Sequence, residues 1–225
     1  MELVVHESPG AVAEAAAARV ADLISGSTNR FSLGLAGGST PEATYLALRA
    51  REPGWSGVDA WLSDERWVPP DDERCNGRMA SVALLDHVDA VFYRPPWSEH
   101  LAPEDSAARY EAQLRSIHGD GPADLVMLGM GDDGHTASLF PGTAALEERS
   151  RWYVANHVPQ MGEDRLTATF PFLWSARLLM ILVVGEKKAE ALKASFDGET
   201  PAGRLGDGDA EVEWHVDRDA ASLLA

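Results

Sequence analysis

Short apolar runs recur along the chain, and the segments between many of them carry apolar residues at helical spacing. The runs lie at residues 3–5, 31–36, 60–62, 90–93, 125–128, 152–154 and 178–184. Helical spacing joins Val12, Ala16, Val20, Leu23 and Ile24, then Tyr110, Leu114 and Ile117, and then Ala189, Leu192 and Phe196 within residues 187–196. Strands that alternate with helices predict an α/β fold, with a mainly parallel sheet covered by helices on both faces.

The last part of the chain departs from this alternation. Val212, Trp214 and Val216 alternate with polar residues, which predicts a half-exposed edge strand. Residues 198–209 are rich in glycine and aspartate, which predicts a surface loop. The 225 residues show no internal repeat and no clear linker, so we expect one domain that spans residues 1–225.

Composition narrows the classes of partner. Acidic residues outnumber basic residues 36 to 19, and the formal net charge is −17. This charge argues against binding to nucleic acid or to an anionic membrane, but a few local cations can still bind a small anion in one pocket. The single cysteine, Cys75, excludes an intramolecular disulfide and a cysteine metal cluster, and is expected to be a small packed or loop residue.

Targeting signals are weak in this sequence. Residues 1–6 lack the basic start and apolar core of a signal peptide. The longest apolar run, residues 178–184, is far shorter than the roughly 20 residues of a membrane span. We therefore expect a cytoplasmic protein.

A glycine-rich segment after the second apolar run predicts a strand that turns directly into a helix. The residues are Leu35-Ala36-Gly37-Gly38-Ser39-Thr40-Pro41-Glu42. Thr40 is a candidate N-cap with Pro41 in the first turn, and Ser39 with Glu42 fits a capping box. Free N–H groups at such a helix start form an anion site, although a capped helix with nothing bound is an equally good interpretation. The motifs of a Walker loop and of a dinucleotide site are both absent.

The segment after residues 125–128 delivers a histidine from a turn rich in glycine and aspartate. It reads Gly129-Met130-Gly131-Asp132-Asp133-Gly134-His135. A histidine beside an acid at the carboxyl end of a buried strand is a candidate acid–base group, and Asp133 is placed to orient it. A purely structural histidine is the alternative. The ligand patterns of an EF-hand or a paired-histidine metal site are missing, so we expect no metal.

Three scattered cations complete the candidate chemistry. Arg66 follows the run Leu62-Ser63-Asp64-Glu65, and its planar guanidinium suits a phosphate or carboxylate. Asp64 and Glu65 are candidates to hold the guanidinium. The alternative is that these charged residues form a solvated turn. Arg165 is the cation of a further short segment, Arg165-Leu166-Thr167. Lys187 and Lys188 open a predicted helix, where they oppose the helix dipole unless an anion binds, and Lys187 more simply points into water. Together these elements predict a pocket for a phosphorylated polyol with one acid–base histidine.

The motifs resemble those of the 6-phosphogluconolactonases, in the glucosamine-6-phosphate isomerase/6-phosphogluconolactonase superfamily. The resemblance extends nearly from end to end and is most specific in Asp133-Gly134-His135-Thr136-Ala137-Ser138-Leu139-Phe140-Pro141. It also includes residues 37–41, 64–68, 165–167, 185–189 and 214–217. It implies a three-layer αβα sandwich whose Rossmann-like, mainly parallel sheet has an antiparallel edge.

Related deaminases share the glycine-rich loop and the Asp-Gly-His core. They resemble this chain less in two places: they carry a tyrosine where Arg66 stands, and a glutamate used in ring opening within the run that corresponds to residues 136–141. Residues 138–141 of this chain contain no acid.

A sugar-phosphate sensor on the same fold is a third possibility, but it would need a DNA-binding extension, and the chain has no basic helical appendage. One departure from the lactonases is Cys75-Asn76-Gly77, where they show Ser-Asn followed by an aromatic residue; Asn76 is retained.

The resemblance implies a role for each matched residue in hydrolysis of a phosphorylated sugar lactone. His135, held by Asp133, would deprotonate water, and Arg66 would stabilise the oxyanion or orient the lactone. Substrate would be bound by Gly37, Gly38, Ser39, Thr40, Asp64, Asn76, Arg165 and Lys188, with the phosphate on the glycine-rich loop and the sugar hydroxyls on Asp64. No metal or redox cofactor is implied, and we expect a monomer or a weak homodimer.

Overall fold

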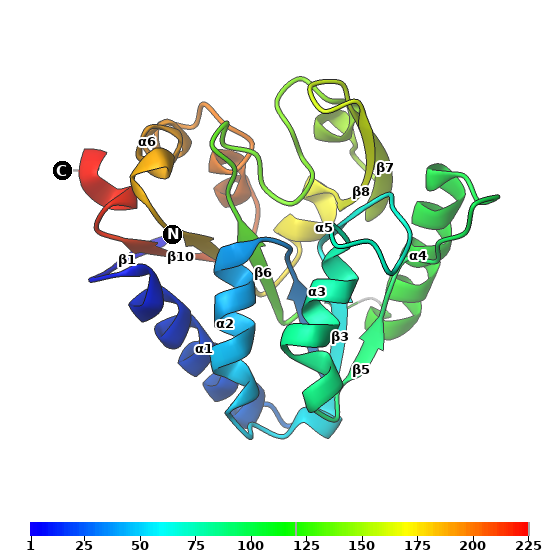
Figure 1. The fold of residues 1–225 in the computed structure, drawn as a ribbon, viewed down its shortest axis with the longest axis horizontal. Helices are drawn as coiled ribbons and strands as arrows, with labels where there is room; N and C mark the ends of the chain where they lie inside the picture. The colour runs from blue at the N-terminus through cyan, green and yellow to red at the C-terminus, as the bar shows by residue number, and fades with distance from the viewer. Residues whose placement is uncertain (120, 225) are drawn as a thin grey trace.

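Seven parallel strands form the central sheet of the computed structural model, which describes residues 1–119 and 121–224 (Figure 1). Every pairing in this sheet is parallel. The strand order is β1 (Glu2–His6), β10 (Glu211–Asp217), β9 (Leu178–Val183), β6 (Leu125–Gly129), β2 (Phe31–Leu35), β3 (Val58–Leu62) and β5 (Val91–Tyr93). The apolar runs that predict strands therefore do form this sheet.

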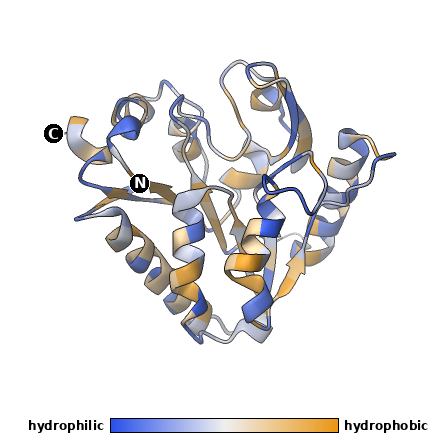
Figure 2. Ribbon diagram, viewed as in Figure 1, coloured by the Kyte–Doolittle hydropathy of each residue, from blue (hydrophilic) through white to orange (hydrophobic). Residues whose placement is uncertain are grey.

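Helices cover both faces of the sheet, so its central strands are buried on two sides, whereas the edge strands β1 and β5 are partly exposed. One face is covered by α1 (Pro9–Gly26), α2 (Ser39–Arg49) and α3 (Asn76–Ala83), and the other by α4 (Pro103–His118), α5 (Phe170–Trp174) and α6 (Ala189–Phe196). The helices carry both hydrophilic and hydrophobic residues along their turns, whereas the central strands are mainly hydrophobic (Figure 2). Strand β9 shows the pattern: Leu178 and Met180 face the first group of helices, while Leu179 and Ile181 face the second.

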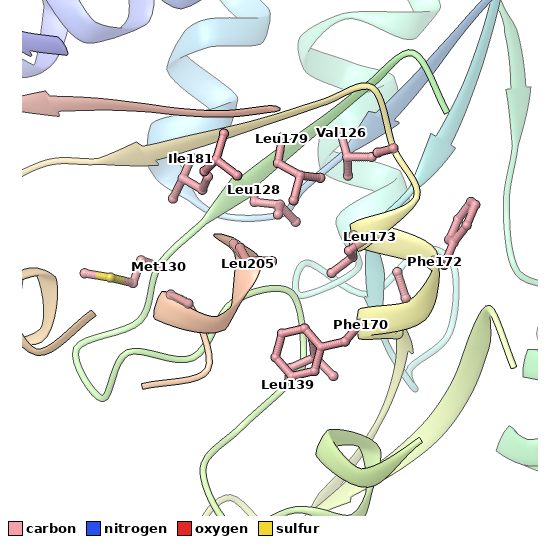
Figure 3. Packing of buried hydrophobic residues seen from close by; sticks show 14 of the residues in the cluster. Val126, Leu128, Met130, Leu139, Phe170, Phe172, Leu173, Leu179, Ile181 and Leu205 are labelled. Carbon is pink, nitrogen blue, oxygen red and sulfur yellow. The ribbon is translucent and has the colours of Figure 1, made fainter. Parts of the chain in front are cut away.

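The core on the second face is built from aliphatic strand residues against aromatic helix residues. Leu128, Leu179 and Ile181 lie near Phe170 and Leu205 (Figure 3). All five side chains are fully buried at 0% exposure. Burial of side chains of this size contributes about 1.5–3 kcal/mol each, so this layer rigidly fixes the carboxyl ends of β6 and β9.

The antiparallel part of the fold is a separate sheet of three strands. Its order is β4 (Asp64–Arg66), β8 (Glu163–Ala168) and β7 (Tyr153–Val158), and both pairings are antiparallel. It lies beyond the carboxyl end of β3, because only Ser63 separates β3 from β4. Short 3-10 helices lie at η1 (Trp55–Gly57), η2 (Leu85–His87), η3 (Ala144–Glu147), η4 (Glu186–Lys188), η5 (Gly203–Asp207) and η6 (Ala220–Leu223).

Two local predictions are wrong, and a third, the helix over residues 187–196, is confirmed with a different first turn. Strand β10 is not an edge strand, because β1 pairs with its outer side and leaves Trp214 at 1% exposure. Residues 198–209 are not only a surface loop, because η5 buries Leu205 completely. The helix predicted over residues 187–196 starts as the 3-10 turn η4 and becomes α-helical at Ala189. Within the described residues, no helix combines the length and apolarity that crossing a membrane requires.

Candidate active site

A cavity of about 280 Å³ opens at the carboxyl ends of β2 and β6. These strands are neighbours in the sheet, but the next strand of this sheet along the chain is β3 after β2 and β9 after β6, and these two lie on opposite sides. Such a switch point in an open α/β sheet creates a crevice where ligands bind. The cavity wall includes ten of the predicted residues: Gly37, Gly38, Ser39, Thr40, Asp64, Arg66, Asn76, His135, Arg165 and Lys188. The eleventh, Asp133, contacts His135.

The glycine-rich loop after β2 needs both of its glycines. A Cβ atom on Gly37 would lie 1.9 Å from Oδ1 of Asn76, so no side chain fits there. Gly38 has a φ of 106°, in the region that favours glycine. This backbone turn starts helix α2 at Ser39, with Gly38 as the N-cap and a first helical bond of 3.0 Å from the Glu42 amide to the Gly38 carbonyl.

The predicted caps of helix α2 are therefore wrong. Thr40 lies inside the helix, and among the described residues no side chain of Ser39 or Glu42 caps its start. The positive φ of Gly38 begins the helix earlier than the capping residues suggest. The first N–H groups of a helix have no intrahelical acceptor, and those of Ser39 and Thr40 belong to residues of the cavity wall. This arrangement suits an anion.

His135 is held by the carboxylate of Asp133. Its Nδ1 lies 2.6 Å from Oδ1 of Asp133, and the same oxygen accepts the His135 backbone N–H at 3.1 Å. Burial raises the pKa of Asp133, but hydrogen bonds and the charge of His135 outweigh it, so the net pKa is lowered. An ionised Asp133 places the imidazole proton on Nδ1 and leaves the lone pair on Nε2.

The imidazole ring of His135 is also confined sterically. It stacks on Phe140 with ring centroids 3.9 Å apart and an angle of 25° between the planes. The ring also lies against the backbone of Gly131, where an added Cβ atom would be 2.0 Å from Nδ1 of His135. The turn continues to Thr136, whose Oγ1 donates to the Gly129 carbonyl at 3.0 Å. The ring is therefore preorganised with one nitrogen available to a ligand.

Asp64 and Asn76 form a buried polar wall of the cavity. Oδ2 of Asp64 accepts from Oγ of Ser138 at 2.6 Å, and its Oδ1 accepts from Nδ2 of Asn76 at 3.2 Å. Asn76 is 1% exposed, and its Oδ1 has no hydrogen-bond partner among the described residues. A buried acceptor without a partner is costly, and this oxygen is packed against the backbone of Gly37.

Glu65 does not belong to the cavity wall. It also does not hold the Arg66 guanidinium, which the sequence suggested as one possibility. Its carboxylate accepts the backbone N–H groups of Asn76 at 2.6 Å, Gly77 at 2.8 Å and Arg66 at 2.8 Å. Burial raises the pKa of Glu65, while these backbone bonds lower it in part. Cys75, buried beside it, is the N-cap of α3, so this group anchors the helix that presents Asn76.

Arg66 and Arg165 lie directly opposite each other in the β4–β8 ladder. Like charges in this position destabilise a sheet. Arg165 is 8% exposed, and burial together with the charge of Arg66 lowers its pKa. Nε of each arginine is buried without a partner among the described residues. Two guanidinium groups on one cavity wall favour an anionic ligand.

Other contacts hold the two arginines in place. Nη2 of Arg165 donates to Glu163 at 2.9 Å, and Nη1 of Arg66 donates to the Arg74 carbonyl at 2.5 Å. Glu163 also pairs with Arg74 at 2.8 Å. Neither Asp64 nor Glu65 forms an ion pair with Arg66 within the described part of the chain. The arginines are therefore linked through Glu163 and Arg74.

Lys188 is the last residue of η4, which follows β9, and it belongs to the cavity wall. Its Nζ pairs with Oδ1 of Asp132 at 2.5 Å, and the Lys188 side chain is 25% exposed. Lys187 is exposed, in line with the interpretation that it points into water. Lys188 is therefore the lysine of the cavity.

Sequence reasoning did not assign four further residues of the cavity wall, Ala137, Ser138, Phe140 and Met161. Ala137 has a φ of 47°, which is uncommon without glycine and turns the backbone at the cavity. Ser138 donates to Asp64, and its N–H donates to Thr167 Oγ1 at 3.1 Å. Their position just after His135 was the available signal, whereas nothing in the sequence marked Met161.

The fold and the cavity define an α/β enzyme with a site for a small anionic substrate. Residues 7–214 match the family model described as glucosamine-6-phosphate isomerases/6-phosphogluconolactonase, and the chain belongs to this family. A 6-phosphogluconolactonase from Nostoc sp. is 36% identical over 211 residues, which cover 87% of this chain and 85% of that protein. The resemblance of the motifs to this superfamily is thereby confirmed.

Solved structures show the same fold. A 6-phosphogluconolactonase from Trypanosoma cruzi superposes with a TM-score of 0.90 at 26% identity, covering 100% of this chain and 97% of that one. A monomeric glucosamine-6-phosphate deaminase superposes with a TM-score of 0.84 at 25% identity, covering 99% and 100%. Because the fold is common to both, the residues of the site must distinguish the two activities.

Proposed function

We propose that this chain hydrolyses 6-phospho-D-glucono-1,5-lactone to 6-phospho-D-gluconate, the second step of the oxidative pentose phosphate pathway. The observation that carries the proposal is the His135–Asp133 pair, 2.6 Å apart, on a cavity wall that also holds Arg66, Arg165 and Lys188. One base and three cations suit a neutral ester group on an anionic sugar. The relatives named as 6-phosphogluconolactonases support the same activity.

The segment after His135 favours hydrolysis over deamination. The deaminases that the chain resembles carry a ring-opening glutamate in this run, whereas residues 136–141 read Thr-Ala-Ser-Leu-Phe-Pro. The hydroxyl of Ser138 is used to hold Asp64, and Ala137 contributes only a methyl group to the wall. This run therefore lacks a group that could transfer protons to and from a sugar ring oxygen.

The proposed chemistry needs one proton carrier. Nε2 of His135 takes a proton from water as the water oxygen attacks C1 of the lactone. The tetrahedral intermediate then expels the ring oxygen, which receives the proton from the imidazolium and becomes the C5 hydroxyl group. Asp133 stabilises the imidazolium between these two transfers. Collapse of the intermediate leaves a carboxylic acid at C1, which loses its remaining proton to solvent, so the product leaves as a carboxylate and no electrons are exchanged.

The cations divide between the two ends of the substrate. We assign the phosphate to the N–H groups of Ser39 and Thr40 at the start of α2 and to Lys188, because a helix start and an ammonium group both favour a dianion. Arg66 then stabilises the developing oxyanion, since its guanidinium group belongs to the same cavity wall as His135. Asp64 and Asn76 bind the sugar hydroxyls.

The test is a direct lactonase assay in which spontaneous hydrolysis is measured in parallel. His135→Ala should lower kcat by about 10²- to 10⁴-fold with little change in KM. His157→Ala is the matched control, because this exposed histidine is also paired with an aspartate, Asp164, at 2.8 Å. An unchanged kcat for His135→Ala would refute the general base, and release of ammonia from glucosamine 6-phosphate would identify a deaminase.

We propose in addition that residues 1–225 act as a single catalytic domain, without a metal or redox cofactor, as a cytoplasmic monomer or weak homodimer. Ester hydrolysis by a histidine base requires neither electrons nor a Lewis acid, which supports the absence of cofactors from the reaction. Light scattering across a concentration series checks the oligomeric state. Activity that is lost on treatment with a chelator, and restored by a metal, would contradict the cofactor assignment.

A further inference from the structure

Asp132 lies beside the one lysine of the cavity, and the mechanism gives it no task. Strands β6 and β9 are neighbours, with Gly129 opposite Leu182, so the turn after β6 meets η4 after β9. This places Oδ1 of Asp132 2.5 Å from Nζ of Lys188. An anion that belongs to the protein therefore already contacts the cation that we assign to the phosphate.

The turn that carries Asp132 sends two adjacent carboxylates in different directions. The Gly134 N–H donates to the Gly131 carbonyl at 3.1 Å, so Asp132 and Asp133 are its two central residues. Asp133 turns to His135, whereas Asp132 turns to Lys188. The Asp132 side chain is 68% exposed, so its carboxylate can be replaced without opening the core.

We propose that Asp132 limits the affinity of the site by competing with the phosphate of substrate and product for Lys188. The inference rests on the proposed function, in which Lys188 binds that phosphate. A carboxylate in contact with the ammonium group neutralises part of its charge, and it repels a dianion that approaches the same atom. Asp132 thus weakens the binding of every phosphorylated ligand of this site.

The competition has a purpose in a reaction that adds charge. The lactone is a phosphate dianion, and the product carries the same phosphate and a new carboxylate. A cavity with three cations would hold that product tightly. A resident anion at Lys188 limits the affinity for the phosphate and favours release of the product.

A positioning role for Asp132 predicts the opposite effect. If Asp132 served mainly to hold Lys188 in the cavity, removal of its charge would let Lys188 move and would weaken phosphate binding. Asparagine keeps the size of the side chain and removes only the charge. The sign of the change in Asp132→Asn therefore distinguishes competition from positioning.

The experiment measures inhibition of the lactonase by inorganic phosphate and by 6-phosphogluconate. Asp132→Asn should lower both inhibition constants, and the KM for the phosphorylated lactone, by about 3- to 10-fold. The difference from the wild type should shrink as salt rises, because exposed charges are screened. Asp197→Asn is the matched control, because Asp197 pairs with Lys193 at 2.7 Å on an exposed surface.

A second background separates this inference from the proposed function. Lys188→Ala alone should raise the KM for the phosphorylated lactone, and a KM that stays unchanged would overturn the phosphate assignment. In the Lys188→Ala background, Asp132→Asn should lower the inhibition constants less than it does in the wild type, because only the direct repulsion of the dianion is left to remove. If Lys188→Ala behaves as expected but Asp132→Asn leaves the constants unchanged or raises them, competition by Asp132 is refuted while the phosphate site stands.

Discussion

Replacement of Asp133 by asparagine tests how much the carboxylate contributes to the base. Both hydrogen bonds from His135 end on the same oxygen, Oδ1, at 2.6 Å and 3.1 Å. The amide oxygen of asparagine can accept both bonds in the same geometry. Asp133→Asn therefore removes the charge next to the imidazole while it keeps the ring in place.

The structure gives the size of the expected loss. Opposite unit charges about 4 Å apart attract by about 4 kcal/mol at an effective dielectric constant of 20. The Asp133 side chain is 50% exposed and that of His135 is 25% exposed, so solvent reduces the attraction to about 2–3 kcal/mol. Because this attraction exists only when the imidazole is protonated, kcat should fall by about 30- to 150-fold.

The assay compares kcat and KM of wild type and Asp133→Asn in the direct lactonase reaction. The lowered pKa of Asp133 keeps this carboxylate ionised below the pH range of ordinary carboxyl groups, so the charge that the substitution removes is present throughout a neutral assay. Asp164→Asn removes the corresponding charge beside the exposed His157 and should leave kcat unchanged. A kcat for Asp133→Asn within about threefold of the wild type would refute the electrostatic role.

Two further predictions concern stability. Gly37→Ala should lower Tm by about 3–10 °C and also reduce kcat/KM, because the new Cβ would clash with Asn76. Gly57→Ala is the control, because a Cβ on Gly57 meets nothing within 4 Å. Equal Tm values for the two variants would contradict the steric argument. Burial lowers the pKa of His118, so the unfolded chain binds more protons, and stability should fall as pH drops through about 6.5 toward that lowered pKa. His118→Gln should flatten the decrease in Tm between pH 7 and 5, and an unchanged slope would exclude His118 as its source.

Much of the fold follows from the apolar pattern because parallel strands buried on both faces leave a strong signal. Leu178 to Val183 is apolar throughout, and the structure places alternate residues in two different cores. The edge position predicted for residues 212–216 is wrong because residues distant in the sequence cover this strand. Its polar residues Glu213 and His215 are covered by Arg19 and His6, which come from the other end of the chain.

The residues of the site were easier to predict than their partners. Motifs at the ends of strands gather at one edge of a parallel sheet, which is why His135, Arg66 and Lys188 meet in one cavity. The start of α2 was predicted too late, because capping preferences describe side chains and Gly38 acts through its backbone. The Asp132–Lys188 contact depends on the orientation of two side chains from different turns, which no local pattern encodes.

The opposed pair of Arg66 and Arg165 has a consequence for thermal stability as well as for binding. Without an anion between them, the two guanidinium groups repel each other and raise the free energy of the folded state. The small sheet is therefore less stable than it would be with a neutral residue at one of these positions. A bound anion relieves this repulsion, so ligand affinity and folding are thermodynamically linked. The protein should therefore melt at a higher temperature with 6-phosphogluconate. Replacement of Arg165 by a neutral residue of similar size should stabilise the empty protein and abolish part of this ligand-induced gain, a trade between activity and stability.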